Sequence, residues 1–581
     1  MKKTNISNAI SVVLFVLLII TTTLLIIDKS DNNNNTINPN EESQFEKIDY
    51  DPQLNIKKNN FNSIDQLNSF IKEYSSSNSG GSVLRTFAST TMEFAEAGAV
   101  NDGMMLAKAG GSDVDFSETN VQVTGIDEAD IIKTDGKYIY TISGNTIFII
   151  DAYPGENAKI ISEIELKSRP SNLFIYDDKL AVFGNFNDAD YFKKKDLSVT
   201  NSMTFFNIYD LEDIKSPSLI KEFKFEGNYF NARLIDNHVY FVSSQYPNSR
   251  EIPMPLIIED DIARNVKIGN VFFYNINYDH VNFMSVHSIN MDQIKNTDSI
   301  TVAVESGQNM YMSFDNLYIT YTQRINEYEL QQDILKDLLQ SKLSESDIEL
   351  IKKINSADND ILNSYEKESK IMQIYYGYLY QLDSNEQETI QENAEEMLLK
   401  KLEEYDYLEF TVINQINVND GKITLGKNGN VPGRIINQFS MDQSNNIFRI
   451  ATTLSARWSR FGKERTESTN NVFTLDMDMN ILDSIKEIAP GESIFSTRFI
   501  GDKLYMVTFE QVDPFFVIDL SNPKDIEILG KLKIPGFSRY LHPYDENTII
   551  GIGRDATDTG RTKGLKISLF DVSEFDNPKE I

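Results

Sequence analysis

The residues that most plainly suggest chemistry lie in one acidic segment, VTGIDEADIIKTDGKYIY, which runs from Val123 to Tyr140. Asp127, Glu128 and Asp130 fall close together in it. Neighbouring like charges are unfavourable unless a cation or hydrogen bonds compensate them. Calcium suits carboxylate and carbonyl oxygens, so these three residues are a predicted calcium site. The segment lacks a D-x-D-x-D-G loop, and the alternative stays open that the carboxylates accept backbone hydrogen bonds and lock the segment into the fold.

Other chemistry has little support. The chain has no cysteine, which excludes disulfides, thiolate metal sites and cysteine nucleophiles. The four histidines lie far apart and form no HExxH pair; they are His238, His280, His287 and His542. No nucleophile elbow, phosphate loop or dinucleotide fingerprint is present. A carboxylate-pair glycosidase remains an alternative, because a sequence gives no distances between acids.

Two weaker groups of polar residues are also candidates. Arg434, Arg498 and His542 lie in conspicuous motifs and are candidates for the lining of a channel, although a buried arginine is more often the partner of a carboxylate. Asp555 and Asp558 lie in the glycine-containing segment RDATDTGRTKG, for which a solvated hairpin loop is the favoured interpretation.

A two-strand pattern recurs from Asn120 to the C-terminus and predicts the fold. Its first half is an acidic or amide turn followed by an alternating strand, in the copies that begin at Asp135, Asp177, Asp236, Asp315, Gly501 and Asp545. Its second half is an apolar strand that ends in an aspartate, often before proline, at Asp151, Asp210, Asp519 and Asp571. Copies recur after 42 residues (Asp135 to Asp177), close to the roughly 40–45 residues of a propeller blade. The prediction is an all-β protein, a β-propeller of about seven four-stranded blades over 119–581, with six and eight blades open.

The segment 324–406 changes to helical periodicity and is predicted to be an α-helical insertion within the propeller. Its last helix is expected to begin with a capping box at Ser384 and Gln387. An apolar stripe follows, at Ile390, Ala394, Met397, Leu398 and Leu402.

The N-terminus predicts a membrane anchor. Residues 9–27 contain no charge, and as a helix they are about 29 Å long, close to the hydrocarbon thickness of about 30 Å. Lysines precede this span, so residues 1–8 are expected in the cytoplasm and the bulk outside. Secretion after signal cleavage is the alternative. Residues 28–118 are predicted to be a flexible tether with one short amphipathic helix around Ile64 to Ile71.

Three long stretches resemble a known family: NVQVTGIDEADIIKTDGKYIY, VPGRIINQFSMDQSNNIFRIATT, and the run that begins GESIFSTRFIGDKLYMVTF. The family consists of secreted or membrane-anchored archaeal and bacterial proteins with a C-terminal β-propeller domain distantly related to WD-type repeats. The resemblance covers Asn120 to the C-terminus and implies a propeller outside the membrane. It implies no reaction. One departure is that the repeat leads us to expect further strands after DVSEFDNPKEI, so that the sequence is a fragment or the last blade closes differently.

These observations favour one function over two rivals. With 55 basic and 87 acidic residues, the net charge of −32 argues against nucleic-acid binding. The favoured hypothesis is a membrane-tethered extracytoplasmic propeller that binds or scaffolds a cell-surface protein or polymer. The rivals are an exported hydrolase with carboxylates at the propeller channel and a calcium-stabilised envelope module without catalysis.

Overall fold

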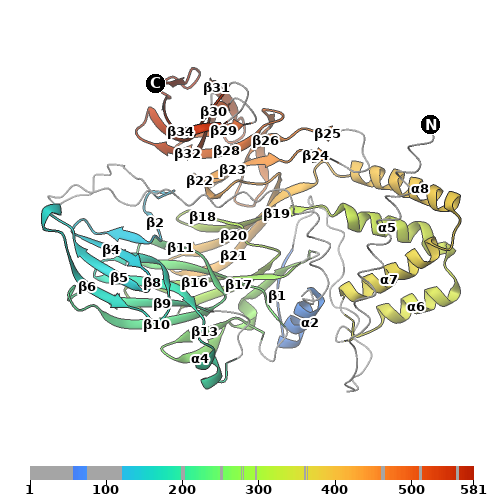
Figure 1. Cartoon of the computed structure of the whole chain (residues 1–581), viewed down its shortest axis with the longest axis horizontal. Coiled ribbons are helices and arrows are strands. Elements are labelled where there is room, and N and C mark those ends of the chain that lie inside the picture. Colours follow the sequence, from blue (N-terminus) through green and yellow to red (C-terminus); the bar gives the residue numbers. More distant parts are fainter. Residues whose placement is uncertain are drawn as a thin grey trace. The chain divides into compact units, whose positions relative to one another are not determined.

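The structure is a computed structural model that describes residues 57–74 and 121–581, apart from residues 198–202, 249–252, 277, 279, 295–296, 359–360, 363, 459–464, 510–512, 535 and 558–561. Residues Lys47–Ile581 belong to one compact unit. The described part is mostly β-structure, with a group of helices between two strands (Figure 1). The predicted spans 1–8 and 9–27 lie outside the described residues. Among the described helices, none is long and apolar enough to cross a membrane.

Seven sheets in the described residues are each built on four antiparallel strands in chain order. The first sheet contains β3 (Ile132–Thr134), β4 (Tyr138–Ser143), β5 (Thr146–Asp151) and β6 (Lys159–Glu165). The second contains β7 (Pro170–Tyr176), β8 (Lys179–Phe186), β9 (Met203–Asp210) and β10 (Ser218–Glu226), extended by β13 (Leu256–Glu259) and β14 (Ile262–Asn265). The third contains β11 (Asn228–Ile235), β12 (His238–Gln245), β16 (Asn282–Asn290) and β17 (Asp298–Val304). Its edges are extended by β2 (Ile126–Glu128) on one side and by β15 (Val271–Tyr274) and β1 (Lys58–Asn60) on the other.

The remaining sheets follow the same plan. The fourth contains β18 (Asn309–Met312), β19 (Asn316–Arg324), β20 (Glu409–Asn419) and β21 (Lys422–Pro432). The fifth contains β22 (Met441–Ser444), β23 (Ile447–Leu454), β26 (Thr469–Leu475) and β27 (Ile481–Ile488). The sixth contains β28 (Ser493–Ile500), β29 (Lys503–Phe509), β30 (Asp513–Asp519) and β31 (Glu527–Ile534). The seventh contains β32 (Phe537–Pro543), β33 (Thr548–Ala556), β34 (Thr562–Asp571) and β35 (Lys579–Glu580). A separate two-stranded piece joins β24 (Arg457–Trp458) to β25 (Arg465–Thr466).

The repeated sequence pattern corresponds to the middle of each sheet. Its six acidic turns connect the first strand to the second, as at Asp177 between β7 and β8 and at Asp236 between β11 and β12. Both residues adopt the left-handed conformation (φ 48° and 49°), which a tight hairpin requires and Asp tolerates. The aspartates of the second half end the third strands, where Asp210, Asp519 and Asp571 accept a backbone N–H two residues on. The turn chemistry therefore sets the register of each sheet.

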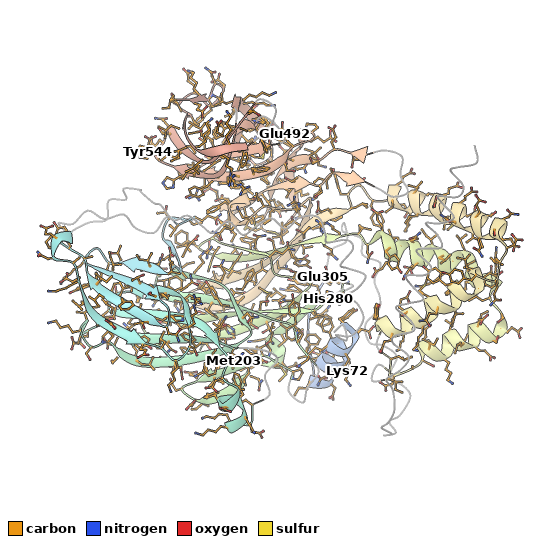
Figure 2. All side chains as sticks on the ribbon, viewed as in Figure 1. Lys72, Met203, His280, Glu305, Glu492 and Tyr544 are labelled. Atoms are coloured by element: carbon orange, nitrogen blue, oxygen red, sulfur yellow. The ribbon has the colours of Figure 1, made fainter. Side chains whose placement is uncertain are left out.

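Hydrophobic cores lie between consecutive sheets. One cluster joins the first and second sheets, for example Ile149 with Leu180, and another joins the sixth and seventh, for example Phe515 with Phe570. Further clusters join the fourth to the fifth sheet and the fifth to the sixth. Figure 2 shows the side chains that fill these spaces. In these four pairs each sheet buries apolar side chains against its neighbour in sequence, as blades do.

Four helices lie between β19 and β20: α5 (Glu327–Leu339), α6 (Glu345–Asn355), α7 (Ser364–Leu379) and α8 (Ser384–Glu403). They share their own cores, in which Ile390, Ala394, Leu398 and Leu402 of α8 are buried and Met397 is exposed. The capping box lies one residue nearer the N-terminus than predicted. Asp383 is the N-cap of α8, and its carboxylate and that of Glu386 form the reciprocal bonds. Asp and Ser are equally good caps, so the sequence offered two adjacent solutions.

The described part of the predicted tether contains the expected short amphipathic helix and, before it, a strand that joins a sheet. Strand β1 pairs with β15, and helix α2 (Ile64–Tyr74) buries Leu67, Phe70 and Ile71. The Phe70 ring packs edge-on against the Tyr278 ring, with 5.3 Å between centroids. Strand β1 is thus part of the third sheet, and the apolar side of α2 packs against aromatic side chains such as Tyr278. The predicted tether residues 28–56 and 75–118 lie outside the described residues.

Strand β35 lies within the stretch DVSEFDNPKEI and is the fourth strand of the seventh sheet. No hydrogen-bonded strand pair within the described residues joins the seventh sheet to the first.

Candidate functional site on the first strands

The seven first strands place one equivalent residue at the third pair from the hairpin turn, and we call this the third-pair position. The pairing registers, counted from the backbone hydrogen bond that closes each turn, identify these residues as Lys133, Phe174, Arg233, Tyr311, Asp442, Arg498 and His542. Their partners on the second strands are tyrosines in four of the seven sheets, Tyr140, Tyr240, Tyr318 and Tyr505.

Basic side chains at the third-pair position are buried. Lys133, Arg233, Arg498 and His542 are 7, 4, 6 and 5% exposed. Buried cations are costly unless they are paired, so their partners decide what this region does.

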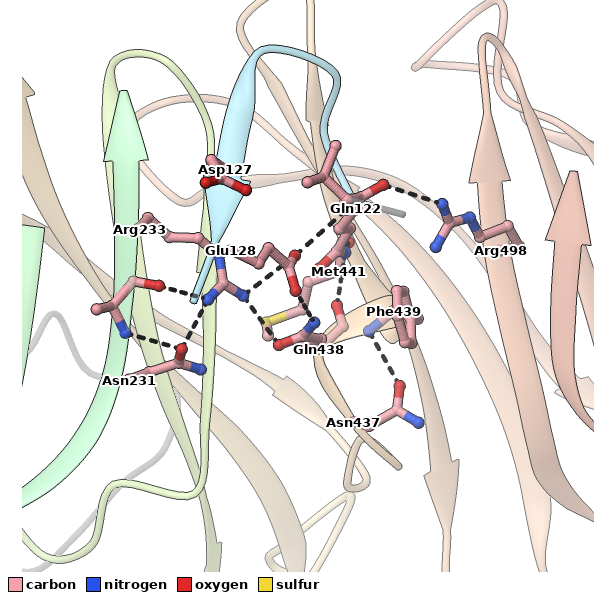
Figure 3. Close-up of polar contacts among 12 residues, drawn as sticks. Gln122, Asp127, Glu128, Asn231, Arg233, Asn437, Gln438, Phe439, Met441 and Arg498 are labelled. Atoms are coloured by element: carbon pink, nitrogen blue, oxygen red, sulfur yellow. Dashed lines mark hydrogen bonds and ion pairs between the residues drawn. The ribbon is translucent and has the colours of Figure 1, made fainter. Parts of the chain in front are cut away.

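The acidic segment supplies two of these partners, and Figure 3 shows the one formed by Glu128 with Arg233. Asp127 Oδ1 lies 2.5 Å from Lys133 Nζ, and Glu128 Oε1 lies 3.4 Å from Arg233 Nη2. The two carboxylates face different sheets because successive residues of a strand, here β2, point to opposite sides. Burial raises the pKa of the Asp127 carboxyl, although the nearby Lys133 lowers it. The two acids therefore neutralise cations of the first and third sheets.

Asp130 lies elsewhere. It forms an isolated bridge with Leu173 of the second sheet, and its Oδ1 accepts the N–H of Ile131 at 2.7 Å. Within the described ranges no three His, Asp or Glu side chains gather as a metal site would require. The structure does not bring Asp127, Glu128 and Asp130 together around one point, and calcium binding there stays a prediction.

The same segment connects sheets that are far apart in sequence. Gln122 Nε2 donates to the carbonyl oxygens of Gln438 and Met441, at 2.9 and 3.0 Å. The backbone N–H of Gln122 donates to Glu128 Oε1 at 3.2 Å. The segment from Val121 to Glu128 thus links the first strand of the third sheet to that of the fifth.

Arg498 differs from Lys133 and Arg233 because no described carboxylate forms an ion pair with it. Its Nη2 donates weakly to the Val121 carbonyl oxygen at 3.4 Å, and its Nη1 is buried without a hydrogen-bond partner among the described residues. The guanidinium lies over the Phe439 ring, 4.9 Å from the centroid. Burial lowers the pKa of Arg498, and the residue nevertheless stays charged at neutral pH.

A pocket of about 250 Å³ lies beside this network. Its walls come from β11, from β18 and the residue before it, and from the short 3₁₀ helix η4 (Gln438–Ser440) with its N-cap. The lining residues are Phe230, Asn231, Gln308, Asn309, Met310, Asn437, Gln438 and Phe439. Five of these eight are amides, two are aromatic and none is charged.

A β-bulge builds one wall of the pocket. The pairing of β11 with β12 shifts register between Tyr229 and Asn231, which leaves Phe230 unpaired. A bulge re-aims side chains, and here the consecutive residues Phe230 and Asn231 both reach the pocket.

The other candidates lie outside the pocket. Arg434 forms an isolated backbone β-bridge with Thr453, and its Nε donates a hydrogen bond to Ser455 Oγ at 3.3 Å. Asp555 forms an ion pair with Lys563 at 3.2 Å, and Asp558 lies outside the described residues. His287 is buried against Ser299 Oγ at 2.9 Å, and His238 Nε2 lies 3.1 Å from Asn290 Nδ2. These contacts are structural.

The sequence analysis missed Arg233, Asn231 and Gln438. A signal was present in the sequence, because YFNARLIDNH and IFSTRFIGDK align without gaps, and this alignment matches Arg233 with Arg498. The repeat was recognised only from its turn onward, so the strand before the turn was not compared. The amides of the pocket carry no such signal, since they come from three different sheets.

Comparisons with known proteins agree with this architecture. A family model described as a beta propeller domain matches residues 116–581. An uncharacterized protein of Methanocaldococcus jannaschii is 34% identical over 475 residues, which cover 80% of this chain and 69% of that protein. An uncharacterized protein of Archaeoglobus fulgidus is 30% identical over 494 residues, covering 80% and 70%. Among solved structures, the N-terminal domain of Nup159 matches 77% of this chain and 86% of its own with 8% identity and a TM-score of 0.26, which is too low to carry an argument. The chain belongs to the beta propeller domain family.

Proposed function

We propose that this protein is a membrane-tethered, extracytoplasmic β-propeller that acts as a binding or scaffold module for a cell-surface protein or polymer, with its ligand site in the pocket of the first strands. The observation that carries this proposal is the lining of the pocket. Amide side chains recognise polar ligands through hydrogen bonds, and aromatic side chains supply apolar contact area. The pocket offers neither a nucleophile with a base nor a pair of carboxylates.

The rival, an exported hydrolase, needs two carboxylates that flank a scissile bond. Glu128 is a carboxylate of the adjoining network, and it already faces Arg233 and Gln438. The geometry therefore favours binding over hydrolysis.

The anchoring part of the proposal rests on the uncharged span 9–27. We expect the full-length protein to sediment with membranes and to resist extraction by carbonate. A variant that lacks residues 1–46 should be released. In intact cells that carry the full-length protein, added protease should digest the compact unit Lys47–Ile581 if that unit lies outside the membrane. This result would establish the orientation.

Two sheet faces suggest that the seven sheets close into a ring of seven blades. On the seventh sheet Ile552 pairs with Ile567 and Ile550 with Leu569, so these four share one face, and Ile567 is 65% exposed. On the first sheet Ile139 pairs with Ile150 and Ile150 with Ile160, and Ile160 is 54% exposed. Packing these apolar faces together would bury both and remove the ends of the array.

Binding at the pocket is tested with a panel of surface polysaccharides and peptides presented to the detergent-solubilised full chain. Asn309→Trp, which fills the pocket at a residue without a described side-chain hydrogen bond, should abolish capture of any ligand that the wild type retains. Phe575→Ala, outside the pocket, is the control. Undiminished capture by Asn309→Trp would contradict the pocket as the ligand site, and breakdown of a retained ligand would favour the hydrolase.

A further inference from the structure

The amides that line the pocket are fixed in one orientation by their protein partners. Arginine has only donors, so an amide that faces it must present its oxygen. Arg233 Nη1 donates to Asn231 Oδ1 at 2.6 Å, and Arg233 Nη2 donates to Gln438 Oε1 at 3.1 Å. The Asn231 oxygen also accepts the N–H of Ala232 at 2.9 Å. Both oxygens are therefore occupied, and the NH₂ groups are the ones left for a ligand.

In two more amides the oxygen also accepts hydrogen bonds from the protein, here from donors other than Arg233. Gln308 Oε1 accepts the N–H and the hydroxyl of Thr322, at 3.0 and 3.1 Å. Asn437 Oδ1 accepts the N–H of Phe439 at 2.9 Å. No described residue accepts a hydrogen bond from the NH₂ group of Asn231, Gln308 or Asn437, and that of Gln438 makes only a 3.5 Å contact with Glu128. In four of the five amides the oxygen thus accepts a hydrogen bond from the protein, whereas the NH₂ group has at most one long described contact.

The charge of Arg498, near the pocket, is positive, as is the partial charge on the hydrogens of these NH₂ groups. Arg233 is compensated by Glu128, whereas Arg498 has no described ion-pair partner and lies directly behind Phe439, which is a wall of the pocket. A site with NH₂ donors and a guanidinium that forms no ion pair with a described carboxylate favours a ligand with acceptor oxygens and negative charge.

We propose that the pocket binds the carboxylate of a sugar acid, so that the ligand is an acidic surface polysaccharide built from such units. This inference rests on the proposed binding function of the same pocket and assigns its ligand class. The carboxylate takes the amide donors, and Phe230 and Phe439 provide apolar faces for a sugar ring. Arg233 is a positioning residue, because it sets the orientation of two amides without facing the ligand itself.

The test compares oligogalacturonate with its methyl ester, which keeps the sugar and removes the charge, by calorimetric titration of the full-length protein. Wild type should bind the acid and not the ester. Asn231→Asp and Gln308→Glu each replace a donor by an acceptor of the same shape, and each should weaken binding of the acid at least about tenfold, as expected for the loss of a hydrogen bond to a charged group. Gln308 is exposed, so its substitution should leave the fold intact. Asn385→Asp makes the same change of charge on the exposed start of α8 and should have no effect.

Equal binding of acid and ester, unchanged in both pocket variants, would overturn the carboxylate assignment and leave the pocket as a binding site. Poly-glutamate bound as tightly as oligogalacturonate, with the same response to the variants, would overturn the sugar part. Absence of binding to any of the three probes would also overturn the inference, while the polysaccharide and peptide panel with Asn309→Trp would still decide the proposed function on its own.

Discussion

The buried ion pair between Glu128 and Arg233 carries the first prediction at the scale of single residues. Arg233 is 4% exposed, so Glu128→Gln leaves a buried cation without its carboxylate. Breaking a buried pair by removing one partner costs about 3 kcal/mol or more. We expect a loss of that order in the free energy of unfolding, measured by urea denaturation.

Asp555→Asn is the matched control, because its ion pair with Lys563 is solvent-exposed and worth at most about 1 kcal/mol. Equal effects of the two substitutions would show that the acidic segment does not lock the fold.

His287 provides a prediction on pH. Burial lowers its pKa to about 3, with a smaller contribution from Arg264, whereas an unfolded histidine titrates near 6.5. Between those values the unfolded chain binds a proton that the folded chain does not, so the folded state loses stability as the pH falls from about 6.5 toward 3. His287→Gln removes this contribution, and its free energy of unfolding should decline less steeply than that of wild type over the same range. Parallel declines would show that His287 is not the group responsible.

Single residues also mark how far the sequence could predict the site. Asp127 and Glu128 stood out because four carboxylates crowd one segment, and structural locking was among the open alternatives. Their partners Lys133 and Arg233 were not foreseeable from spacing alone, since Arg233 lies more than one hundred residues away and meets Glu128 only through the pairing of β2 with β11. The orientation of an amide is still less accessible, because for Gln308 and Gln438 it depends on hydrogen bonds to atoms from another strand.

At the scale of elements, α2 shows how a segment outside the repeats becomes part of a sheet. Phe70 lies among the rings of Phe61, Phe273 and Tyr278 and is fully buried. Phe70→Ala should lower the free energy of unfolding by about 3–5 kcal/mol, the usual cost of truncating a buried phenylalanine. Ser69→Ala, on the exposed side of α2, is the control. A loss below about 1 kcal/mol in Phe70→Ala, measured by denaturant unfolding, would mean that α2 does not pack on the third sheet in solution.

The elements were the most predictable level. Acidic turns followed by alternating strands identified the second strand in six of the seven sheets, because turn residues with φ > 0 are chemically distinctive. The turn of the fifth sheet, Asn445–Asn446, fits the amide form of this pattern but was not identified as a copy, and its motif was noticed only through the family resemblance. The docking of α2 was not predicted, because an amphipathic stripe indicates burial without naming the surface that covers it.

At the scale of the whole molecule, calcium dependence separates a metal-stabilised fold from an ion-paired one. A cation at one hundred times its dissociation constant would add about 2.7 kcal/mol. Because Asp127 faces Lys133 and Glu128 faces Arg233, the ion-paired alternative predicts the same unfolding midpoint in calcium and in EDTA. Stabilisation by calcium in wild type that disappears in Asp127→Asn would instead establish the predicted calcium site.

Closure of the seven sheets is tested most directly on the face that the seventh sheet leaves uncovered. If the first sheet covers this face in solution, Ile567→Asp buries a carboxylate among isoleucines and should lower the free energy of unfolding by more than about 2 kcal/mol. If the face is open to water, the same change should alter stability by no more than about 0.5 kcal/mol. Ile262→Asp is the control, since Ile262 is 72% exposed on β14 of the second sheet. Light scattering completes the test, because a dimer that dissociates in Ile567→Asp would show that a second copy, and not the first sheet, covers the face.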